Sequence, residues 1–341
     1  MDHRKELKIF FRGEMKDSGQ DAGGMAKEWF NLIWEALISE EAKLFRTTET
    51  DEITYTINES SIDHRDYYKK FEFAGLVLAK AIFDGIPLNL WLNKLIFKLL
   101  LNPNSTIDLD DLKGFDTQVY NSLKYIQDNQ IDEDEYLEQY FEHEQNGEMH
   151  PLIPDGSNIK VTDDNKEQFI MLKSEFMITS FITQQIQAMR NGFQRLINLE
   201  LLQHFTDQEF SLLCWGESKI DLQEWKNNTE YSGCYDDNHE VIIWFWDLMK
   251  KLEQDSLRII FQFVTGMSRL PIGGFSWINK NRGEKQNFTI KPVRYSKRAP
   301  YPKSYTCFNR LHLPLYPNKK TLIKNVKFLI KNNEIYGFGN E

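Results

Sequence analysis

The sequence lacks the features of a disulfide scaffold, a membrane protein or a secreted protein. Cysteines are scarce, and no pair has the spacing of a zinc site: Cys214, Cys234 and Cys307. Such a set is typical of a reducing compartment, so we expect a cytoplasmic protein. The longest apolar-leaning stretch, around residues 88–101, is interrupted by charged residues and is too short to span a bilayer. The N-terminal residues are charged where a signal peptide would need an apolar run, so we expect no signal peptide.

Motifs that bind nucleotides or metals are absent as well. No glycine-rich phosphate loop and no His-Glu-x-x-His sequence occurs, and the Gly-Gly pairs at 23–24 and 273–274 stand alone. The seven histidines are scattered singly, which is more typical of surface or core residues than of metal ligands. We therefore expect no metal and no organic cofactor.

The charge is distributed unevenly along the chain. The net charge is −10, yet the residues from Lys280 onward include 14 Lys and Arg and only three acidic residues. The segment Asp132–Glu144 is the opposite, with seven carboxylates in thirteen residues. No recognisable nucleic-acid module accompanies the basic end, so we do not expect a nucleic-acid partner. The basic end is either solvated surface or a lobe that meets an acidic surface, within the chain or on a partner.

The spacing of apolar residues predicts two lobes. Helical spacing dominates the first two thirds, and the polar segment 225–239 is the best linker. We predict an α+β fold with a large, mainly helical N-lobe (1–230), a flexible hinge (231–238) and a smaller α/β C-lobe (239–341). The predicted strands are residues 53–57, 158–161, 288–293 and 304–313, and the predicted helices are residues 29–37, 67–83, 115–127, 166–190, 241–252, 257–264 and 319–331.

Cys307 has the surroundings of a reactive thiol. It lies in a run with strand-like alternation, close in sequence to four cations: Lys297, Arg298, Lys303 and Arg310. Nearby positive charge lowers the pKa of a thiol and raises its thiolate fraction. On composition alone, a small buried core residue is the competing interpretation for any cysteine. That interpretation suits Cys214, which lies in an apolar helical run, whereas Cys234 lies in the linker without activating neighbours.

Motifs around Cys307 and along the chain carry a family resemblance. Thr306–Asn309 reads Thr-Cys-Phe-Asn, and a Leu-x-Leu-Pro stretch follows at 311–314. Other motifs occur in the same order: Arg12–Glu14, Gly23-Gly24, Glu28–Phe30, Phe73–Gly75, Phe261–Gly266, Ser268-Arg269 and Pro271–Phe275. With them the chain resembles the catalytic domain of HECT-type ubiquitin ligases over nearly its whole length. The runs 244–246 and 337–339 are most similar to the branch that bears WW domains.

This resemblance implies a two-lobed ubiquitin ligase. In the family a ubiquitin-conjugating enzyme carries ubiquitin as a thioester and passes it to the cysteine, and a lysine of a protein substrate then attacks the new thioester. Cys307 is the nucleophile that the resemblance implies. Thr306 and Phe308 are expected to fix its loop, and Asn309 and Arg269 to hold the ubiquitin tail or polarise the carbonyl. Phe338 is expected to be needed for transfer to lysine, and a hydrophobic anchor for the C-terminal tail is its competing interpretation. Asp21 and Glu28 are expected to orient the incoming lysine, and a helix N-cap is the competing interpretation of Asp21.

The resemblance also implies binding surfaces. The conjugating enzyme is expected in an apolar groove of the N-lobe, formed by Val119, Ser122, Leu123, Leu137 and Phe169. Val119 and Leu123 are spaced i, i+4 and share one helix face, although inward packing is the competing interpretation. A second, non-covalent ubiquitin site retains only Phe141, because its tyrosines align with Ala42 and Thr47. Rotation about the hinge is expected to turn Cys307 from the conjugating enzyme toward the substrate.

Three residues depart from the family pattern. Tyr305 stands where His is usual, His312 where the WW-bearing branch often has an acidic residue, and Lys27 where Arg is usual. An inactive HECT-like protein that binds ubiquitin or the conjugating enzyme is the alternative function, and the presence of Cys307 and Phe338 favours an active ligase. An unrelated cysteine hydrolase needs a positioned His and an Asp or Asn, and no such signature is visible.

Overall fold

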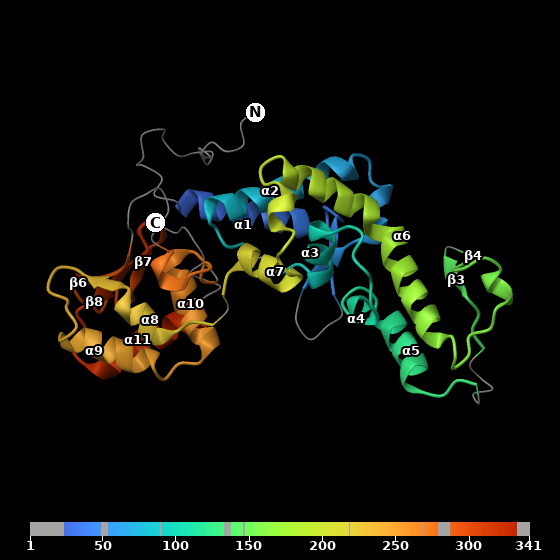
Figure 1. Ribbon diagram of the computed structural model, residues 1–341. Coiled ribbons are helices and arrows are strands. Elements are labelled where there is room, and N and C mark those ends of the chain that lie inside the picture. Colours follow the sequence, from blue (N-terminus) through green and yellow to red (C-terminus); the bar gives the residue numbers. More distant parts are fainter. Residues whose placement is uncertain are drawn as a thin grey trace. The chain divides into compact units, whose positions relative to one another are not determined.

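The computed structural model describes residues 24–48, 54–88, 91–132, 138–145, 147–217, 219–267, 269–278 and 287–332. Helices and short strands alternate along this part of the chain, so the fold class is α+β, as predicted. The helices are α1 (Gly24–Ile38), α2 (Tyr67–Asp84), α3 (Lys94–Leu101), α4 (Leu109–Leu112), α5 (Thr117–Asp128), α6 (Lys166–Gln194), α7 (Asp207–Trp215), α8 (Leu222–Asn227), α9 (Glu240–Met249), α10 (Gln254–Thr265) and α11 (Lys319–Lys331) (Figure 1). The strands are β1 (Phe45–Thr47), β2 (Tyr55–Ile57), β3 (Glu142–Gln145), β4 (Glu148–Pro151), β5 (Thr229–Tyr231), β6 (Phe288–Val293), β7 (Lys303–Tyr305) and β8 (Arg310–Pro314).

The chain divides into two compact units. The first, called the helical unit, consists of Trp34–Ala79 and Leu90–Phe210. The second, called the sheet unit, consists of the described parts of Met1–Ile33, Lys80–Asn89 and Ser211–Glu341. The predicted lobes, 1–230 and 239–341 with a hinge at 231–238, divide the chain differently and stay a prediction.

Polar caps set where the helices of the helical unit begin. The Oδ1 atom of Asn93 accepts the N–H of Leu95 at 2.9 Å at the start of α3. The Oδ1 atom of Asp116 accepts the N–H of Val119 at 2.9 Å at the start of α5. Each cap satisfies an N–H group that has no partner inside its helix. The long helix α6 then packs against α3, α4 and α5 and organises this unit.

Two glycines allow α2 and α6 to approach each other closely. A Cβ atom on Gly75 would lie 1.9 Å from the carbonyl oxygen of Met189. A Cβ atom on Gly192 would lie 1.7 Å from the carbonyl oxygen of Glu72. Both distances are far inside van der Waals contact, so this crossing requires a residue without a side chain on each helix.

The sheet unit contains a four-stranded sheet with the strand order β5-β6-β8-β7. β5, β6 and β8 run parallel, and β7 pairs antiparallel with β8. Trp225 of α8 is fully buried in the core beside this sheet, stacked on Phe275 at 5.2 Å and edge-to-face with Phe261 and Phe288. Aromatic rings of this size dominate the burial of apolar area, so Trp225 is central to the stability of the unit.

The structure confirms most predicted elements and corrects three. The predicted helices 67–83, 166–190 and 319–331 correspond to α2, α6 and α11. The predicted strand 158–161 is wrong: residues 156–158 form a 3-10 turn, and Lys160 makes only an isolated bridge with Tyr140. The predicted strand 304–313 is two strands, β7 and β8, separated by a turn. The predicted linker 225–239 contains the end of α8 and all of β5.

Candidate active site

Cys307 lies at the tip of the hairpin formed by β7 and β8. The strands pair antiparallel, with Tyr305 opposite Arg310, and the 3-10 turn Thr306–Phe308 joins them. Asn309 ends the turn in the left-handed conformation (φ 46°, ψ 42°), and its N–H donates to the carbonyl oxygen of Thr306 at 3.3 Å. Asparagine tolerates this conformation better than most residues. The backbone of Cys307 therefore occupies a defined turn, whereas its side chain lies outside the described residues.

Helix α10 packs against this turn and against both of its strands. The last residue of α10, Thr265, is fully buried, and its Oγ1 donates to the carbonyl oxygen of Phe261 at 2.8 Å. The same Oγ1 accepts the N–H of Met267 at 3.2 Å. Gly266 lies between them with a φ of 72°, which ends the helix in the conformation that favours glycine. These contacts give a structural reason for the Thr-Gly pair of the sequence motif.

Lys27 connects the end of α10 with the Cys307 turn. Its side chain is buried on α1, and its Nζ donates to the carbonyl oxygen of Thr265 at 3.0 Å. The same Nζ donates to Oδ1 of Asn309 at 3.5 Å, and the Asn309 residue is only 2% exposed. A buried ammonium group needs polar partners of this kind because it has lost its hydration. The sheet unit thus brings a positive charge to the residue that ends the turn.

The exposed face of the sheet beside this turn is basic. The strand register sets Lys291 and Lys303 beside His312, and the guanidinium group of Arg310 lies 5.2 Å from the ring centre of Phe308. Burial lowers the pKa of His312, and the charges of Arg310, Lys291 and Lys303 lower it further. The Nε2 atom of His312 is buried and has no hydrogen-bond partner in the described part of the chain. His312 is therefore neutral at pH 7, in surroundings whose positive charge favours a thiolate.

The other predicted catalytic residues are only partly within the described chain. Thr306 is the first residue of the turn. Glu28 on α1 and Arg269 in the loop after α10 both belong to the sheet unit and are half-buried. Asp21 and Phe338 lie outside the described residues.

The remaining cysteines differ from Cys307 in their position in the fold. Cys214 is buried in α7, and burial raises the pKa of its thiol well above the ordinary value, as expected of a core residue. Cys234 is exposed and precedes the buried Tyr235. Within the described ranges, no group of three or more His, Cys, Asp or Glu side chains is arranged to hold a metal ion. No helix in the described part of the chain has both the length and the apolar composition needed to cross a membrane.

Known proteins match this chain over almost all of its length. Residues 31–341 match the HECT-domain (ubiquitin-transferase) family. The chain belongs to this family. The resemblance inferred from the motifs around Cys307 is thereby confirmed.

Three relatives show the extent of the similarity. The chain is 35% identical over 344 residues to the E3 ubiquitin-protein ligase pub1 of Schizosaccharomyces pombe, covering 100% of this chain and 43% of pub1. It is 36% identical over 323 residues to HACE1 of Danio rerio, covering 94% of this chain and 35% of HACE1. It is 32% identical over 338 residues to Nedd-4 of Drosophila melanogaster, covering 95% of this chain and 32% of Nedd-4. The chain spans less than half the length of these curated relatives.

Four of the residues predicted to bind the conjugating enzyme lie on α5 and α6 of this HECT domain. On α5, Ser122 is exposed and Val119 is half-buried, whereas Leu123 is only 2% exposed. Phe169 of α6 is fully buried, and Leu137 lies outside the described residues. Leu123 and Phe169 pack inward, which agrees with the competing interpretation for these two residues, and the apolar groove stays a prediction. Val119 and Ser122 are the members of this set with accessible side-chain surface.

Phe141, predicted to bind a second ubiquitin, is a core residue. It is 1% exposed, and its ring packs edge-to-face on Phe169 with the centroids 5.5 Å apart. A partner cannot contact this ring without rearranging the core, so the position of Phe141 gives no support to the predicted role.

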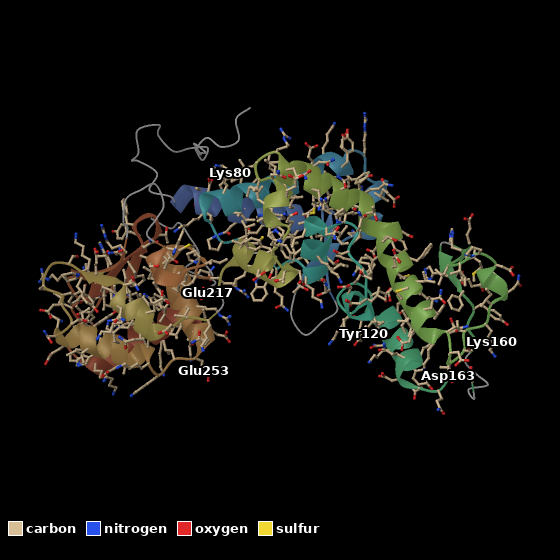
Figure 2. The ribbon with its side chains drawn as sticks, viewed as in Figure 1. Lys80, Tyr120, Lys160, Asp163, Glu217 and Glu253 are labelled. Carbon is tan, nitrogen blue, oxygen red and sulfur yellow. The ribbon has the colours of Figure 1, made fainter. Side chains whose placement is uncertain are left out.

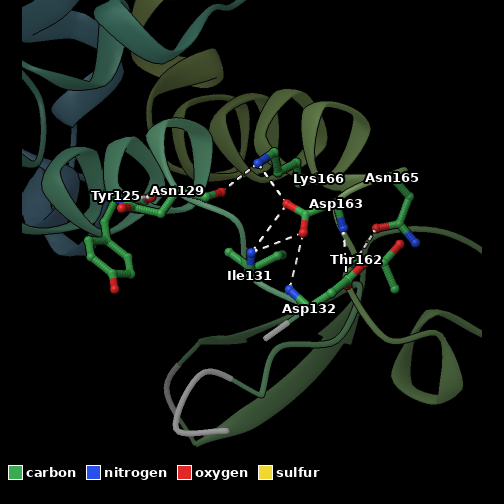
Figure 3. Close-up of polar contacts among 8 residues, drawn as sticks. All are labelled: Tyr125, Asn129, Ile131, Asp132, Thr162, Asp163, Asn165 and Lys166. Carbon is green, nitrogen blue, oxygen red and sulfur yellow. Dashed lines mark hydrogen bonds and ion pairs between the residues drawn. The ribbon is translucent and has the colours of Figure 1, made fainter. Parts of the chain in front are cut away.

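Asp163 fixes the chain between α5 and α6 (Figures 2 and 3). Its carboxylate accepts the N–H groups of Ile131 at 3.1 Å and of Asp132 at 3.2 Å. It also accepts a hydrogen bond from Nζ of Lys166 at 2.8 Å. The same Nζ donates to the carbonyl oxygen of Asn129 at 2.6 Å. The Lys166 ammonium and these backbone N–H groups lower the pKa of the Asp163 carboxyl. One carboxylate thus holds the segment after α5 against the start of α6.

Sequence reasoning did not identify Lys27 or Asp163 as site-shaping residues. The signal for Lys27 was its place directly before the Glu28–Phe30 motif, where the family resemblance implies an arginine. The signal for Asp163 was a polar run before an apolar periodic segment, which indicates a helix start. Neither pattern predicts the distant partners that the fold supplies.

Proposed function

We propose that this HECT domain accepts ubiquitin on Cys307 and transfers it to a lysine of a protein substrate. The Cys307 thiolate attacks the carbonyl carbon of the thioester between ubiquitin and a conjugating enzyme. A new carbon–sulfur bond forms, and the thiolate of the conjugating enzyme leaves. A neutral lysine amine then attacks the Cys307 thioester, an amide bond forms, the Cys307 thiolate leaves, and one amine proton is released to the solvent. The first exchange is nearly balanced in energy, so positioning is the main requirement.

The observation that carries this proposal is the turn of Cys307 in a chain that matches the HECT family. The turn lies at a hairpin tip, its closing residue Asn309 is held by Lys27, and the adjoining sheet face is basic. Reactive cysteines occur in electropositive surroundings, because positive charge stabilises the thiolate. A reduced thiol also suits the cytoplasm, which we propose as the location of the reaction.

The assisting residues are assigned by the family resemblance and by their place in the sheet unit. Thr306 and Asn309 belong to the turn itself, and Arg269 follows α10, which packs on the turn. We assign Arg269 and Asn309 to the ubiquitin tail and its carbonyl, where a donor stabilises the developing oxyanion. Asp21 and Glu28 orient the incoming lysine, and Phe338 supports the transfer to it.

The conjugating enzyme docks on α5 in this proposal. Val119 and Ser122 supply accessible contact surface, Leu123 and Phe169 form the floor beneath them, and Leu137 completes the site. Such a site combines an anchored apolar floor with a polar rim, as protein interfaces commonly do. The Asp163 contacts support it by holding the neighbouring backbone.

Two lobes that move about a joint are part of the proposal, since Cys307 has to face two partners in turn. The contacts of residues 229–235 favour a joint that precedes them. β5 pairs with β6, and the buried Tyr235 donates from its hydroxyl to the carbonyl oxygen of Leu313 at 2.9 Å. Glu217 (Figure 2) forms an isolated bridge with Leu270. A hinge at 231–238 stays a prediction.

The test is adduct formation with activating enzyme, a panel of conjugating enzymes, ATP and ubiquitin. We expect a ubiquitin adduct that a thiol reductant removes, and we expect Cys307→Ala to abolish it. Cys234→Ser is the matched control, because Cys234 is an exposed cysteine of the same unit and its loss leaves the adduct intact. Phe338→Ala still forms the adduct but modifies substrate lysines poorly.

Three results would contradict the proposal at different points. Absence of an adduct with every conjugating enzyme indicates the inactive binding protein instead of a ligase. An adduct that persists in Cys307→Ala shows that another residue is the acceptor. Equal loss of adduct formation and transfer in Phe338→Ala removes the specific role of Phe338.

A further inference from the structure

The C-terminal part of the sheet unit carries an unbalanced positive charge. Residues 287–332 contain eleven Lys and Arg and no Asp or Glu. One of these cations, Lys319, pairs with Asp247 at 2.7 Å. Within the described chain, no ion pair is formed by the exposed cations of α11 and of the loop 294–302: Arg294, Lys297, Arg298, Lys320, Lys324, Lys327 and Lys331. Among the described residues, this end of the protein therefore has positive charge that no ion pair offsets.

The helix α11 and the loop 294–302 contact each other through one pair of rings. Lys320, Lys324, Lys327 and Lys331 follow each other at spacings of three and four residues, which aligns them along one face of α11. Phe328 adjoins this lysine face, and its ring stacks on Tyr301 of the loop with the centroids 4.6 Å apart and the planes inclined by 18°.

A hydrogen bond fixes the loop in this place. The hydroxyl group of Tyr316 donates to the carbonyl oxygen of Pro300 at 2.7 Å. The stacked pair Tyr301–Phe328 therefore connects α11, which carries the lysines, to the loop that carries Lys297 and Arg298. We use the name α11 basic surface for six of these residues: Lys297, Arg298, Lys324, Lys327, Phe328 and Lys331.

The chemistry of this surface fits an acidic polypeptide better than a membrane. The apolar residues of α11, Leu322, Val326 and Leu329, are buried in the core, so they cannot insert into a bilayer. Phe328 is 38% exposed, but one side of its ring is covered by Tyr301. Flexible lysines around one accessible aromatic ring suit carboxylates next to a small apolar side chain.

The α11 basic surface lies close in the chain to the nucleophile. Tyr301 precedes β7, and Cys307 follows six residues later at the tip of the same hairpin. A fully extended chain spans at most about 3.6 Å per residue, so Tyr301 and Cys307 are separated by no more than about 22 Å. An extended substrate segment of about six residues covers the same distance. The surface is thus within reach of the residues that flank an acceptor lysine.

We propose that the α11 basic surface binds an acidic segment of the protein substrate, about six residues from the lysine that receives ubiquitin. This assignment rests on the proposed ligase function and adds a substrate class to it. Binding of the segment raises the local concentration of the acceptor lysine at Cys307. Exposed ion pairs contribute little singly, and three together correspond to about a tenfold effect.

The test compares labelled peptides with a single lysine. One peptide carries four glutamates about six residues after the lysine, a second carries them before it, and a third has glutamine at those positions. Binding of each peptide to the full chain is measured by fluorescence anisotropy, without ubiquitin. Transfer of ubiquitin from the preformed Cys307 adduct to each peptide is measured in a single turnover. We expect one acidic peptide to bind and react about tenfold better than the glutamine peptide, with the advantage falling as salt is added.

Matched variants separate a specific surface from general charge. In Lys324→Gln/Lys327→Gln/Lys331→Gln we expect the acidic preference to disappear while the adduct still forms. The control, Lys70→Gln/Lys113→Gln/Lys160→Gln, removes the same charge from three exposed positions of the helical unit and keeps the preference. Both variants are also tested for binding to vesicles that contain anionic phospholipid.

Failure of this proposal is distinct from failure of the ligase function. Equal binding of acidic and neutral peptides to the full chain overturns it, as does a preference that the triple variant retains. Vesicle binding that depends on Lys324, Lys327 and Lys331, without a peptide preference, assigns the surface to a membrane and overturns it as well. Absence of the Cys307 adduct contradicts the ligase function, and the anisotropy measurement still decides whether acidic segments bind.

Discussion

The imidazole ring of His312 lies against the phenol ring of Tyr305, with the centroids 4.5 Å apart and the planes inclined by 49°. The two residues belong to β8 and β7, on either side of the Cys307 turn. Both depart from the pattern that the family resemblance implies, which is His at position 305 and, in the WW-bearing branch, an acidic residue at position 312. This chain places a neutral ring contact there, so no carboxylate at position 312 offsets the charges of Lys291 and Lys303.

The partly buried position of His312 among cations predicts that the stability of the protein depends on pH. The pKa of His312 is lowered from 6.5, first by burial and then by Arg310, Lys291 and Lys303. The unfolded chain therefore binds this proton more readily than the folded one, so the stabilisation is present above about pH 6.5 and is lost as the pH falls through the lowered pKa. We expect His312→Gln to lose less stability than the parent between pH 7.5 and 5.5 in urea unfolding.

An exposed histidine provides the control for this measurement. His204 is exposed and belongs to the helical unit, so His204→Gln should keep the pH dependence of the parent chain. If His312→Gln follows the same pH dependence as the parent, burial and the neighbouring cations do not lower the pKa of His312 in the folded protein.

The close crossing of α2 and α6 predicts that a single added methyl group lowers the stability of the protein. In Gly192→Ala the new Cβ lies 1.7 Å from the Glu72 carbonyl oxygen, so the helices must separate. Overpacking of this kind costs about 1–3 kcal/mol of unfolding free energy. Ser180→Ala is the control, because Ser180 is exposed on the same helix. Chemical denaturation of both variants checks the prediction, and equal stability would mean that the helices tolerate a wider crossing.

Sequence patterns predicted most helices well, because helix formation depends on residues that are close together in the sequence. The helix 319–331 was predicted with its observed bounds, since its apolar residues recur at helical spacing and Asn318 caps it. The run 304–313 alternates as one strand would, and alternation does not reveal that Asn309 turns the chain back. The segment 225–239 is polar and resembles a linker, yet β5 pairs with β6. That partner lies almost sixty residues further along the sequence.

The residues of the candidate site could be predicted from the sequence only where they belong to a recognisable motif. Cys307, Thr306 and Asn309 follow from the motif, and the structure adds why Asn occupies position 309. The burial of Phe141 was not predictable, because an aromatic residue in a motif suits a core and a contact surface equally well. The contact of Lys27 with Thr265 joins residues 238 positions apart, and no single-sequence pattern specifies such a pair.

The Asp163 contacts predict a local effect on the chain after α5. In Asp163→Asn the charge that pairs with Lys166 is lost, and the amide offers only one acceptor oxygen to the N–H groups of Ile131 and Asp132. We expect these two amides to exchange hydrogen faster, and we expect slower formation of the ubiquitin adduct. Asp164→Asn is the control, because Asp164 is exposed and adjacent in sequence.

The same substitution predicts a change in acid sensitivity. The carboxyl pKa of Asp163 is lower in the folded protein, so its stabilisation is present above the unfolded value of about 3.8 and is lost as the pH falls below it. Asp163→Asn should therefore lose less stability than the parent on acidification. Equal acid sensitivity in Asp163→Asn and the parent would contradict the role of this carboxylate.

The buried ammonium of Lys27 predicts that the Cys307 turn depends on a residue far away in the sequence. Lys27→Met keeps the apolar stem but leaves the Thr265 carbonyl and the Asn309 side chain without this donor. A buried polar group that loses its partner costs about 1–3 kcal/mol, so we expect lower stability and faster exchange of the Asn309 amide, which donates to Thr306. Lys43→Met, at an exposed position, should change neither. Unchanged exchange at Asn309 in Lys27→Met would show that the turn is held by the hairpin alone.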